Sequence, residues 1–265
     1  MMPLIVYSRS TEDFAKNMDG DFLKVSGPPT EETLKFMAYD EIIAIGGGSV
    51  IDTAKIIARN SKRKKVIAIP TTASGAAKTS HAAYWQGGRK YSIETPRAEV
   101  RIDTRLLKTL PDNVIRSTSY DALSQALESY WSKKATLVSK IFAQRATEII
   151  IHQIENDYPD LRELIRGGNL SGEAIEITGT NIVHAISYPM TAFFDVSHGL
   201  AIGLALSAVA RYIGCEIEIP EYKINLNKKL DIELIANEAL TYPQIHDAKK
   251  DITKEQVMNI LEESL

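Results

Sequence analysis

The sequence is poor in the features that mark several classes of protein. Its 265 residues include one cysteine, Cys215, which excludes an intramolecular disulfide framework and fits a reducing compartment. No stretch of about 18 uninterrupted apolar residues is present, which argues against a membrane-spanning helix. The first residues also lack the charged flank and long apolar core of a signal peptide. We therefore expect a soluble cytoplasmic protein without a membrane partner.

A strong charge of either sign is also missing. The formal net charge is −3 and the isoelectric point is near 6.0, so the chain has no overall basic field of the kind that drives nucleic-acid binding. One local basic cluster, residues 62–65 (KRKK), is most simply a set of solvated loop charges. The apolar and charged fractions, 44% and 25%, are those of an ordinary globular protein. No nucleic-acid partner is expected.

Strands and helices alternate in the first part of the chain. Short apolar runs predict buried strands over 4–7, 22–25, 41–45 and 66–69. Between them, helix starts are indicated at Thr11 and Thr30, and a helix over 50–58. This alternation favours a mostly parallel sheet covered on both faces. We expect an α/β nucleotide-binding domain over residues 1–112.

The second part follows the helical period, and strand-like runs largely disappear. Helices are predicted over 119–131, 136–156, 170–185 and 198–213, with an exposed terminal helix within 249–265. We expect an all-α domain over residues 113–265.

A glycine-rich turn follows the third predicted strand and opens a helix. There, backbone N–H groups converge on an anion and the helix dipole favours negative charge. A plain tight turn is the alternative, but several polar residues surround the same carboxyl edge of the sheet, where ligands of open α/β sheets bind. The predicted nucleotide-binding residues are Gly46, Gly47, Gly48, Ser49, Asp52, Lys55, Thr71 and Thr72.

A possible metal site lies in the second domain. Asp121 and Gln125 are four residues apart in a helical segment, and so share one helix face. His184 and His198 follow fourteen residues apart across a bend that contains Pro189, so both can point into one cavity. One carboxylate and two imidazoles suit Zn²⁺ or Fe²⁺. Each histidine alone is more simply a structural residue, and the set carries the prediction.

These segments resemble one enzyme family. Residues 46–55 (GGGSVIDTAK) and 69–73 (IPTTA) are similar to the cofactor signature and next loop of the iron-containing alcohol dehydrogenases, whose fold is shared with dehydroquinate synthase. Residues 121–130 (DALSQALESY) resemble that family's first ligand helix, and 184–199 its two-histidine segment. The resemblance covers roughly residues 40–215 of a chain shorter than typical members. It implies NAD(P)H, a divalent metal held by Asp121, His184 and His198, and alcohol or aldehyde chemistry.

The chain departs from the family pattern at three places. Residues 74–78 (SGAAK) replace the usual Gly-Thr-Gly-Ser-Glu run. Gln125 stands where most members of the iron-dependent branch have a histidine, so it is either a fourth, weak ligand through its carbonyl oxygen or a partner of another ligand. The metal is then Fe²⁺, Zn²⁺ or Mn²⁺. Tyr188 stands where many members have a further histidine, and it is either a catalytic proton-relay residue or a packing tyrosine.

The sequence around the predicted ligands, residues 121–132, 174–178 and 184–191, most resembles the branch of phosphonoacetaldehyde reductases. That resemblance implies reduction of phosphonoacetaldehyde to 2-hydroxyethylphosphonate, or more generally the interconversion of a small alcohol and aldehyde. An anionic substrate tail needs cations, and the candidates are Lys78, Arg89 and Lys90. The alternative for each of the three is a solvated hairpin residue.

Two other functions share these features. One is a lyase or cyclase like dehydroquinate synthase, which the residues around Asp121 and Tyr188 disfavour. The other is a shortened relative that binds nucleotide without turnover, which the altered 74–78 loop favours and the intact Asp121, His184 and His198 disfavour. The partner of either enzyme is a small molecule, whereas the shortened relative binds nucleotide or another partner. The sequence leaves a homodimer open.

Overall fold

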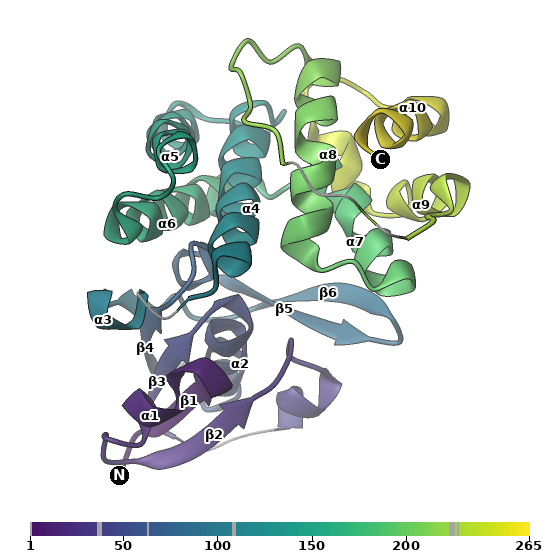
Figure 1. Cartoon of the computed structure of the whole chain (residues 1–265). Coiled ribbons are helices and arrows are strands. Elements are labelled where there is room, and N and C mark those ends of the chain that lie inside the picture. Colours follow the sequence, from purple (N-terminus) through teal and green to yellow (C-terminus); the bar gives the residue numbers. More distant parts are fainter. Residues whose placement is uncertain (1, 36–38, 63, 108–109, 223–225, 227) are drawn as a thin grey trace.

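The computed structural model describes residues 2–35, 39–62, 64–107, 110–222, 226 and 228–265. A parallel sheet with its covering helices makes up one half of the molecule, and a set of longer helices stands above it (Figure 1). Among the described residues, no helix has the length and apolarity needed to cross a bilayer.

The five strands of the main sheet are all parallel and lie in the order β2-β1-β3-β4-β7. The chain crosses over between neighbours, so helices must lie on the faces, as predicted for an α/β fold. The carboxyl ends of β1 and β3 are adjacent, at the point where the strand order reverses. The strands are β1 (Leu4–Ser8), β2 (Asp21–Val25), β3 (Glu41–Gly46), β4 (Lys65–Pro70) and β7 (Glu99–Val100).

Both faces of this sheet are buried, as the sequence predicts. Helix α2 (Gly48–Asn60) packs on one face against alternate residues of β1 and β3, such as Val6 and Ala44. The short helices α1 (Glu12–Ala15) and α3 (Thr104–Leu107) cover the other face. Successive side chains of a strand point to opposite faces of the sheet, so neighbouring residues of one strand belong to two separate apolar clusters.

Helical turns begin after both predicted starts, and the one after Thr11 is short. Thr11 ends a 3₁₀ turn (Arg9–Thr11) and is followed directly by the four residues of α1. The start at Thr30 leads to a 3₁₀ helix, η2 (Glu31–Lys35), and residues 36–38 lie outside the described residues. The segment after Thr11 has no long apolar stripe to bury, and a favourable first residue alone does not sustain a helix.

The helical half contains α4 to α10, and most predicted segments match them. The predicted helix over 198–213 is α8 to the residue. The predicted continuous helix over 170–185 is wrong, because α6 ends and α7 begins within it. Gly179 has φ 70°, and Asn181 caps α7 by accepting from Ile182 N–H. The helices are α4 (Asp112–Tyr130), α5 (Leu137–Glu155), α6 (Leu161–Thr178), α7 (Ile182–Phe194), α8 (His198–Ile213), α9 (Ile232–Ala239) and α10 (Lys254–Ser264).

A two-stranded hairpin joins the two halves. Strands β5 (His81–Gln86) and β6 (Arg89–Glu94) pair antiparallel across Gly87 and Gly88, whose φ angles of 57° and 76° suit a tight primed turn. The hairpin projects from the sheet half beneath α7 and α8 (Figure 1). It places residues of the first half against the helices of the second.

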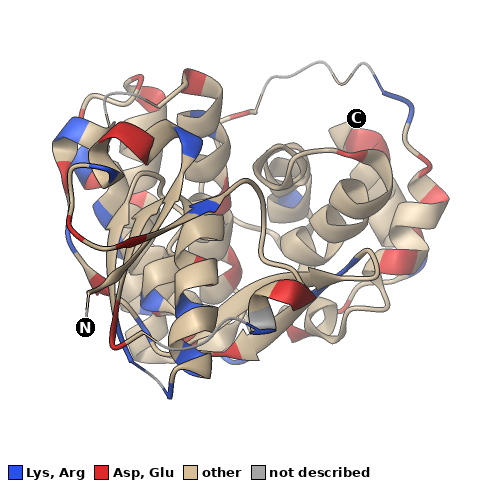
Figure 2. Ribbon diagram, turned by 90° about the horizontal axis from the view of Figure 1, so that it is seen from below, with Lys and Arg blue, Asp and Glu red and all other residues tan. Residues whose placement is uncertain are grey.

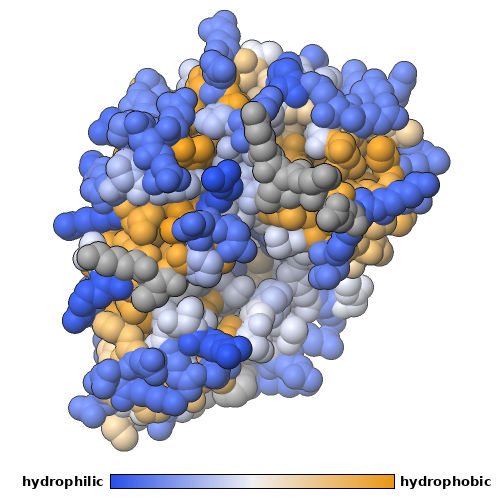
Figure 3. All heavy atoms as spheres, viewed as in Figure 1, coloured by the Kyte–Doolittle hydropathy of each residue, from blue (hydrophilic) through white to orange (hydrophobic). Residues whose placement is uncertain are grey.

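Surface charges are mixed in sign on both halves (Figure 2). In the predicted basic cluster, Lys64 and Lys65 are half exposed and face Asp40 and Glu99, while Arg63 lies outside the described residues. This arrangement agrees with a set of solvated charges. On the face shown in Figure 3, apolar side chains reach the surface in separate patches between hydrophilic ones.

Candidate metal centre and nucleotide cleft

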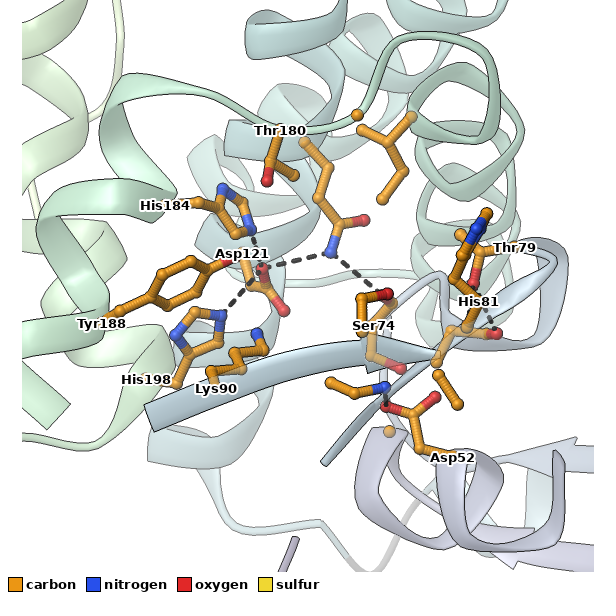
Figure 4. Close-up of a pocket in the computed structure, with 18 of the residues that line it drawn as sticks. Asp52, Ser74, Thr79, His81, Lys90, Asp121, Thr180, His184, Tyr188 and His198 are labelled. Atoms are coloured by element: carbon orange, nitrogen blue, oxygen red, sulfur yellow. Dashed lines mark hydrogen bonds and ion pairs between the residues drawn. The ribbon is translucent and has the colours of Figure 1, made fainter. Parts of the chain in front are cut away.

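A cleft of about 1100 Å³ lies between the two halves of the molecule. One wall comes from the start of α2, the loop after β4 and the hairpin, and the other from α4, α7 and α8. Figure 4 shows side chains of both walls, with Ser74 and Asp52 on one side and Asp121, His184 and His198 on the other. A cleft at the carboxyl edge of an open α/β sheet is where ligands of such folds bind.

Three predicted metal ligands converge in this cleft. Each of Asp121, His184 and His198 offers one ligand atom, and these atoms all lie within 4.8 Å of one another. Asp121 Oδ1 is 3.3 Å from His184 Nε2 and 3.9 Å from His198 Nε2. The arrangement of one carboxylate and two imidazoles suits a tetrahedral or more open divalent metal site.

The local fold explains how distant residues meet. Asp121 lies in the middle of α4, His184 in the first turns of α7, and His198 begins α8. The predicted bend at Pro189 is wrong, because Pro189 lies inside α7. The chain instead turns at Asp195, which ends α7 in the left-handed conformation with φ 51°. An αL residue at that place ends the helix as a C-cap does.

Glu128 supports His184 and was missed by the sequence prediction. Its carboxylate accepts a very short hydrogen bond from His184 Nδ1, and it also accepts the backbone N–H groups of Asn181 (3.0 Å) and Val183 (2.7 Å). It is fully buried. Because Nδ1 is committed to Glu128, Nε2 is left to face Asp121 and any metal, the usual arrangement around metal-binding histidines. A sequence signal existed, since Asp121, Gln125 and Glu128 follow i, i+4, i+7 spacing.

The two histidines differ in charge preference. Burial opposes a charge on His184, but Glu128 and Asp121 outweigh it and raise its pKa to about 10. Burial together with the positive Lys90 lowers the pKa of His198 to about 3, in spite of Asp121. Burial also opposes the charge of Asp121, yet the two imidazoles hold the pKa of that carboxyl below its usual value. The cluster thus has an ionised carboxylate and a neutral His198, both able to bind a cation, whereas His184 is protonated without a metal and must release its Nε2 proton when a cation binds.

Gln125 makes three hydrogen bonds that fix its orientation. Its amide nitrogen donates to the Ser74 carbonyl oxygen and to Asp121 Oδ1, both at 3.1 Å. Its amide oxygen accepts from Ser171 Oγ at 2.9 Å. A carbonyl oxygen can only accept, so the nitrogen must be the atom that faces Ser74. Of the two predicted alternatives for Gln125, this geometry favours a partner of Asp121.

Tyr188 and one of the predicted cations, Lys90, reach the same centre, and a second, Arg89, lies further out in the cleft. The Tyr188 ring stacks on His198, with centroids 5.9 Å apart, and Lys90 Nζ lies 4.6 Å from the Tyr188 ring centre. Figure 4 shows Tyr188 and Lys90 directed toward the metal-site residues. Arg89, further out on the hairpin, donates to Thr241 Oγ1 at 2.9 Å and lies over the Tyr242 ring.

Lys78 does not join them. Its ammonium lies 3.7 Å from Glu173 Oε1 on α6, and Lys78 is not among the described residues that line the cleft. The prediction of Lys78 as a substrate-binding residue therefore does not match its position. The sequence places Lys78 and Lys90 in one segment, but the 3₁₀ helix η3 (Ala76–Lys78) turns the first outward.

The glycine-rich turn faces two hydroxyl groups with no hydrogen-bond partner in the described structure. Thr72 Oγ1 and Ser74 Oγ are buried and unpaired. A Cβ atom at Gly47 would lie 3.1 Å from Thr72 Oγ1, and one at Gly48 would lie 3.2 Å from Ser74 Oγ. The start of α2 thus combines a helix N-terminus, small residues and two hydroxyls without a partner in the described structure. These groups fit a bound phosphate, because each would gain a hydrogen bond that the protein does not provide.

Only half of the predicted nucleotide-binding set lines the cleft within the described residues: Gly48, Ser49, Asp52 and Thr72. The other members lie behind it. Thr71 donates its backbone N–H to the Gly46 carbonyl at 3.1 Å, and Gly47 caps α2.

Lys55 has a structural position that the prediction did not anticipate. Its ammonium is buried and donates to the carbonyl oxygens of Ala76 and His81 and to Thr79 Oγ1. It therefore holds the loop that leads into the hairpin. Asp52 accepts from Ala83 N–H at 3.1 Å and still lines the cleft, and burial raises the pKa of its carboxyl.

Family models match most of the chain. Residues 22–101 match the model described as iron-containing alcohol dehydrogenase, and residues 115–231 match the C-terminal model of the same family. The chain belongs to the iron-containing alcohol dehydrogenase family. These matches begin earlier and end later than the resemblance seen at roughly 40–215.

Individual relatives are moderately similar. The chain is 29% identical to the phosphonoacetaldehyde reductase of Streptomyces viridochromogenes, over 76% of this chain and 62% of that protein. It is 30% identical to the 4-hydroxybutyrate dehydrogenase of Clostridium kluyveri, over 62% of this chain and 52% of the relative. It thus spans between half and two thirds of the curated relatives it matches. An iron-containing alcohol dehydrogenase from Thermotoga maritima has the same fold, with a TM-score of 0.83 at 22% identity, over 100% of this chain and 92% of that one.

Proposed function

We propose that this chain is a metal-dependent NAD(P)H oxidoreductase that interconverts a small aldehyde and its alcohol. One observation carries the proposal: the Asp121, His184 and His198 cluster faces the glycine turn and its orphaned hydroxyls across a single cleft. A metal-binding wall and a phosphate-binding wall in one cleft bring a carbonyl and a nicotinamide together. The balanced reaction is aldehyde plus NAD(P)H plus a proton, giving alcohol plus NAD(P)⁺.

In this proposal Asp121, His184 and His198 hold a divalent ion, with Fe²⁺, Zn²⁺ and Mn²⁺ as candidates. When bound, the metal polarises the carbonyl as a Lewis acid and the nicotinamide supplies the hydride. Glu128 keeps His184 Nε2 directed at the site, and Gln125 does the same for Asp121. These residues contribute orientation, which is the protein's main part in cofactor chemistry.

The product alkoxide needs a proton, and Tyr188 is the proposed relay residue. Its ring is buried between His198 and Lys90, so its hydroxyl belongs to the metal-side wall. Lys90 Nζ, 4.6 Å from the centre of the Tyr188 ring, places a positive charge beside this part of the cleft.

The proposed substrate class is a small aldehyde with an anionic tail, such as phosphonoacetaldehyde. Support comes from Lys90 and Arg89, both on the hairpin and both lining the cleft. The similarity to phosphonoacetaldehyde reductase adds to it. NADPH is as acceptable as NADH, because Ser26 and Gly27 after β2 offer no carboxylate to reject a 2′-phosphate.

We also propose residues 1–112 and 113–265 as the two domains. The apolar clusters of the sheet half draw only on residues before Asp112, where α4 begins, and the large cluster of the helical half draws almost entirely on residues after it.

The proposed function is tested by elemental analysis of the purified protein and by the loss of reduced-nicotinamide absorbance. We expect one divalent metal per chain and oxidation of NADH or NADPH with phosphonoacetaldehyde or glycolaldehyde. The variant with both His184→Ala and His198→Ala should lose metal and turnover together. Metal retained in full by that double variant would refute the proposed site, and tight metal and nucleotide binding without turnover would favour the non-catalytic alternative.

A further inference from the structure

The loop after β4 belongs to the sheet half of the cleft and packs against α6 of the helical half. Residues 73–75 pack against α6 at two glycines, Gly168 and Gly172. A Cβ atom at Gly168 would lie 2.1 Å from the Ala73 carbonyl oxygen, and one at Gly172 would lie 2.4 Å from the Gly75 carbonyl oxygen. The loop of the first half therefore rests directly on backbone of the second. Such a close contact leaves little room for the loop to move independently.

Ser74 belongs to both walls through different atoms. Its side-chain oxygen is the orphaned hydroxyl beside Gly48, on the nucleotide side. Its backbone carbonyl accepts from the Gln125 amide, on the metal side. A ligand that accepts a hydrogen bond from the Ser74 hydroxyl therefore bonds to the same residue whose carbonyl holds the Gln125 amide.

Gln125 completes the connection to the metal site. The second proton of its amide nitrogen goes to Asp121 Oδ1, the atom nearest to both histidines. In Figure 4, the dashed line to Ser74 and the one to Asp121 that start from the same amide nitrogen are these two bonds. Ser171 holds the amide oxygen, so the amide is fixed in one orientation. The planar amide of Gln125 thus connects Ser74, in the proposed phosphate-binding site, to the metal ligand Asp121.

We propose that Gln125 is a positioning residue that couples nucleotide binding to metal binding. The coupling is positive: nucleotide phosphate orders Ser74, Ser74 holds the Gln125 amide, and the amide presents Asp121 to the metal. By reciprocity, bound metal tightens nucleotide binding by the same factor. The inference rests on the proposed function, because it requires both ligands. It gives a role to the glutamine at the position where the sequence resemblance leads one to expect a histidine.

The test measures the affinity of the whole chain for Zn²⁺ by competition with a chelator, with and without saturating NADPH. Pairwise couplings between sites commonly reach about 5- to 150-fold, and we expect Zn²⁺ to bind about tenfold more tightly with NADPH present. The coupling is the ratio of the Zn²⁺ affinities with and without NADPH. Gln125→Met keeps the length of the side chain but removes both donated hydrogen bonds, so this ratio should fall to about one. Gln125→Asn, too short to reach both partners, serves as the second variant.

Ser187→Ala is the matched control. Ser187 Oγ lies 3.3 Å from His198 Nδ1, so it supports a metal ligand from inside the helical half. Its removal should weaken Zn²⁺ binding slightly and equally in both conditions, leaving the ratio at the wild-type value. A purely structural defect would behave like this control.

Three results would overturn the proposal. A wild-type ratio near one, with both ligands bound, shows that no coupling exists. A wild-type ratio retained by both Gln125 variants shows that coupling does not pass through Gln125. Failure of the wild-type chain to bind Zn²⁺ or NADPH at all removes the proposed function as well, and is recognised by the missing ligand itself.

Discussion

The two walls of the cleft prepare for their ligands in opposite ways. The wall of the sheet half offers glycines, backbone N–H groups and the unpaired hydroxyls of Thr72 and Ser74. The wall of the helical half offers ionisable groups that are already paired, with Glu128 beneath His184 and Gln125 beside Asp121. On the sheet side, two hydroxyls have no hydrogen-bond partner within the described protein. On the helical side, His184 and Asp121 are hydrogen-bonded to other side chains of the protein.

The difference follows from the cost of burial. An unpaired hydroxyl costs little enough for a folded protein to keep until a ligand arrives, whereas an unpaired buried carboxylate or imidazolium does not. The charged wall must therefore carry its own network of partners. Removing one polar group should therefore have different results on the two walls. On the helical side it should weaken metal binding, and on the sheet side it should weaken nucleotide binding.

The largest effect is expected for Glu128→Gln on the charged wall. The amide is nearly isosteric but does not hold the His184 imidazole with a charged acceptor. Loss of such a partner of a metal-binding histidine typically weakens metal binding about 10- to 100-fold. Chelator competition with Zn²⁺ measures it. NADPH affinity in the absence of metal should stay unchanged, and an equal loss of both would contradict the division into two walls.

A comparable effect, on stability, is expected for Gly168→Ala at the seam between the walls. The added methyl meets the Ala73 carbonyl and forces the backbone apart. Overpacking of this kind typically costs about 1–3 kcal/mol. Denaturant unfolding of variant and wild type gives the difference. Gly27→Ala is the control, because a Cβ there meets nothing within 4 Å. Equal stability of Gly168→Ala and wild type would show that the walls are not held together there.

Thr72→Val on the neutral wall should affect nucleotide alone. The hydroxyl has no protein partner in the described structure, so stability should be kept or slightly raised. A hydrogen bond to a charged phosphate contributes about 1.5 kcal/mol or more, so NADPH should bind about tenfold more weakly by fluorescence titration. The matched control is Thr95→Val, another unpaired buried hydroxyl that does not line the cleft. Identical NADPH affinities for the two variants would count against a phosphate-binding role of Thr72.

The smallest effect is expected for Lys90→Met on the hairpin. An exposed ion pair contributes up to about 1 kcal/mol, so kcat/KM for an anionic aldehyde should fall about fivefold. A neutral aldehyde of similar size should be less affected. Lys78→Met is the control, because the Lys78 ammonium faces Glu173 outside the cleft. It should leave kcat/KM unchanged for both the anionic and the neutral aldehyde. A larger effect of Lys78→Met than of Lys90→Met would reverse the assignment.

Local patterns were sufficient for much of the fold. Alternating apolar residues defined the buried strands, and the glycine run after β3 marked the start of α2. The spacing of Asp121 and Gln125 placed both on one face of α4, as the bond between them confirms. The starts of the first two helical segments were predicted, but the four-residue length of α1 and the break between α6 and α7 were not. Helix length there is decided by which surfaces are available for packing.

The sequence by itself determined the parallel sheet, the helical second half and the residue types of a metal site. Periodicity and short-range spacing express these directly. Only the tertiary structure decided which polar groups meet. It placed Glu128 under His184, turned Lys78 and Lys55 away from the cleft, and joined Ser74 to Asp121 through Gln125. Those pairings join residues far apart in the chain, and the distances between them are set by how helices and loops pack.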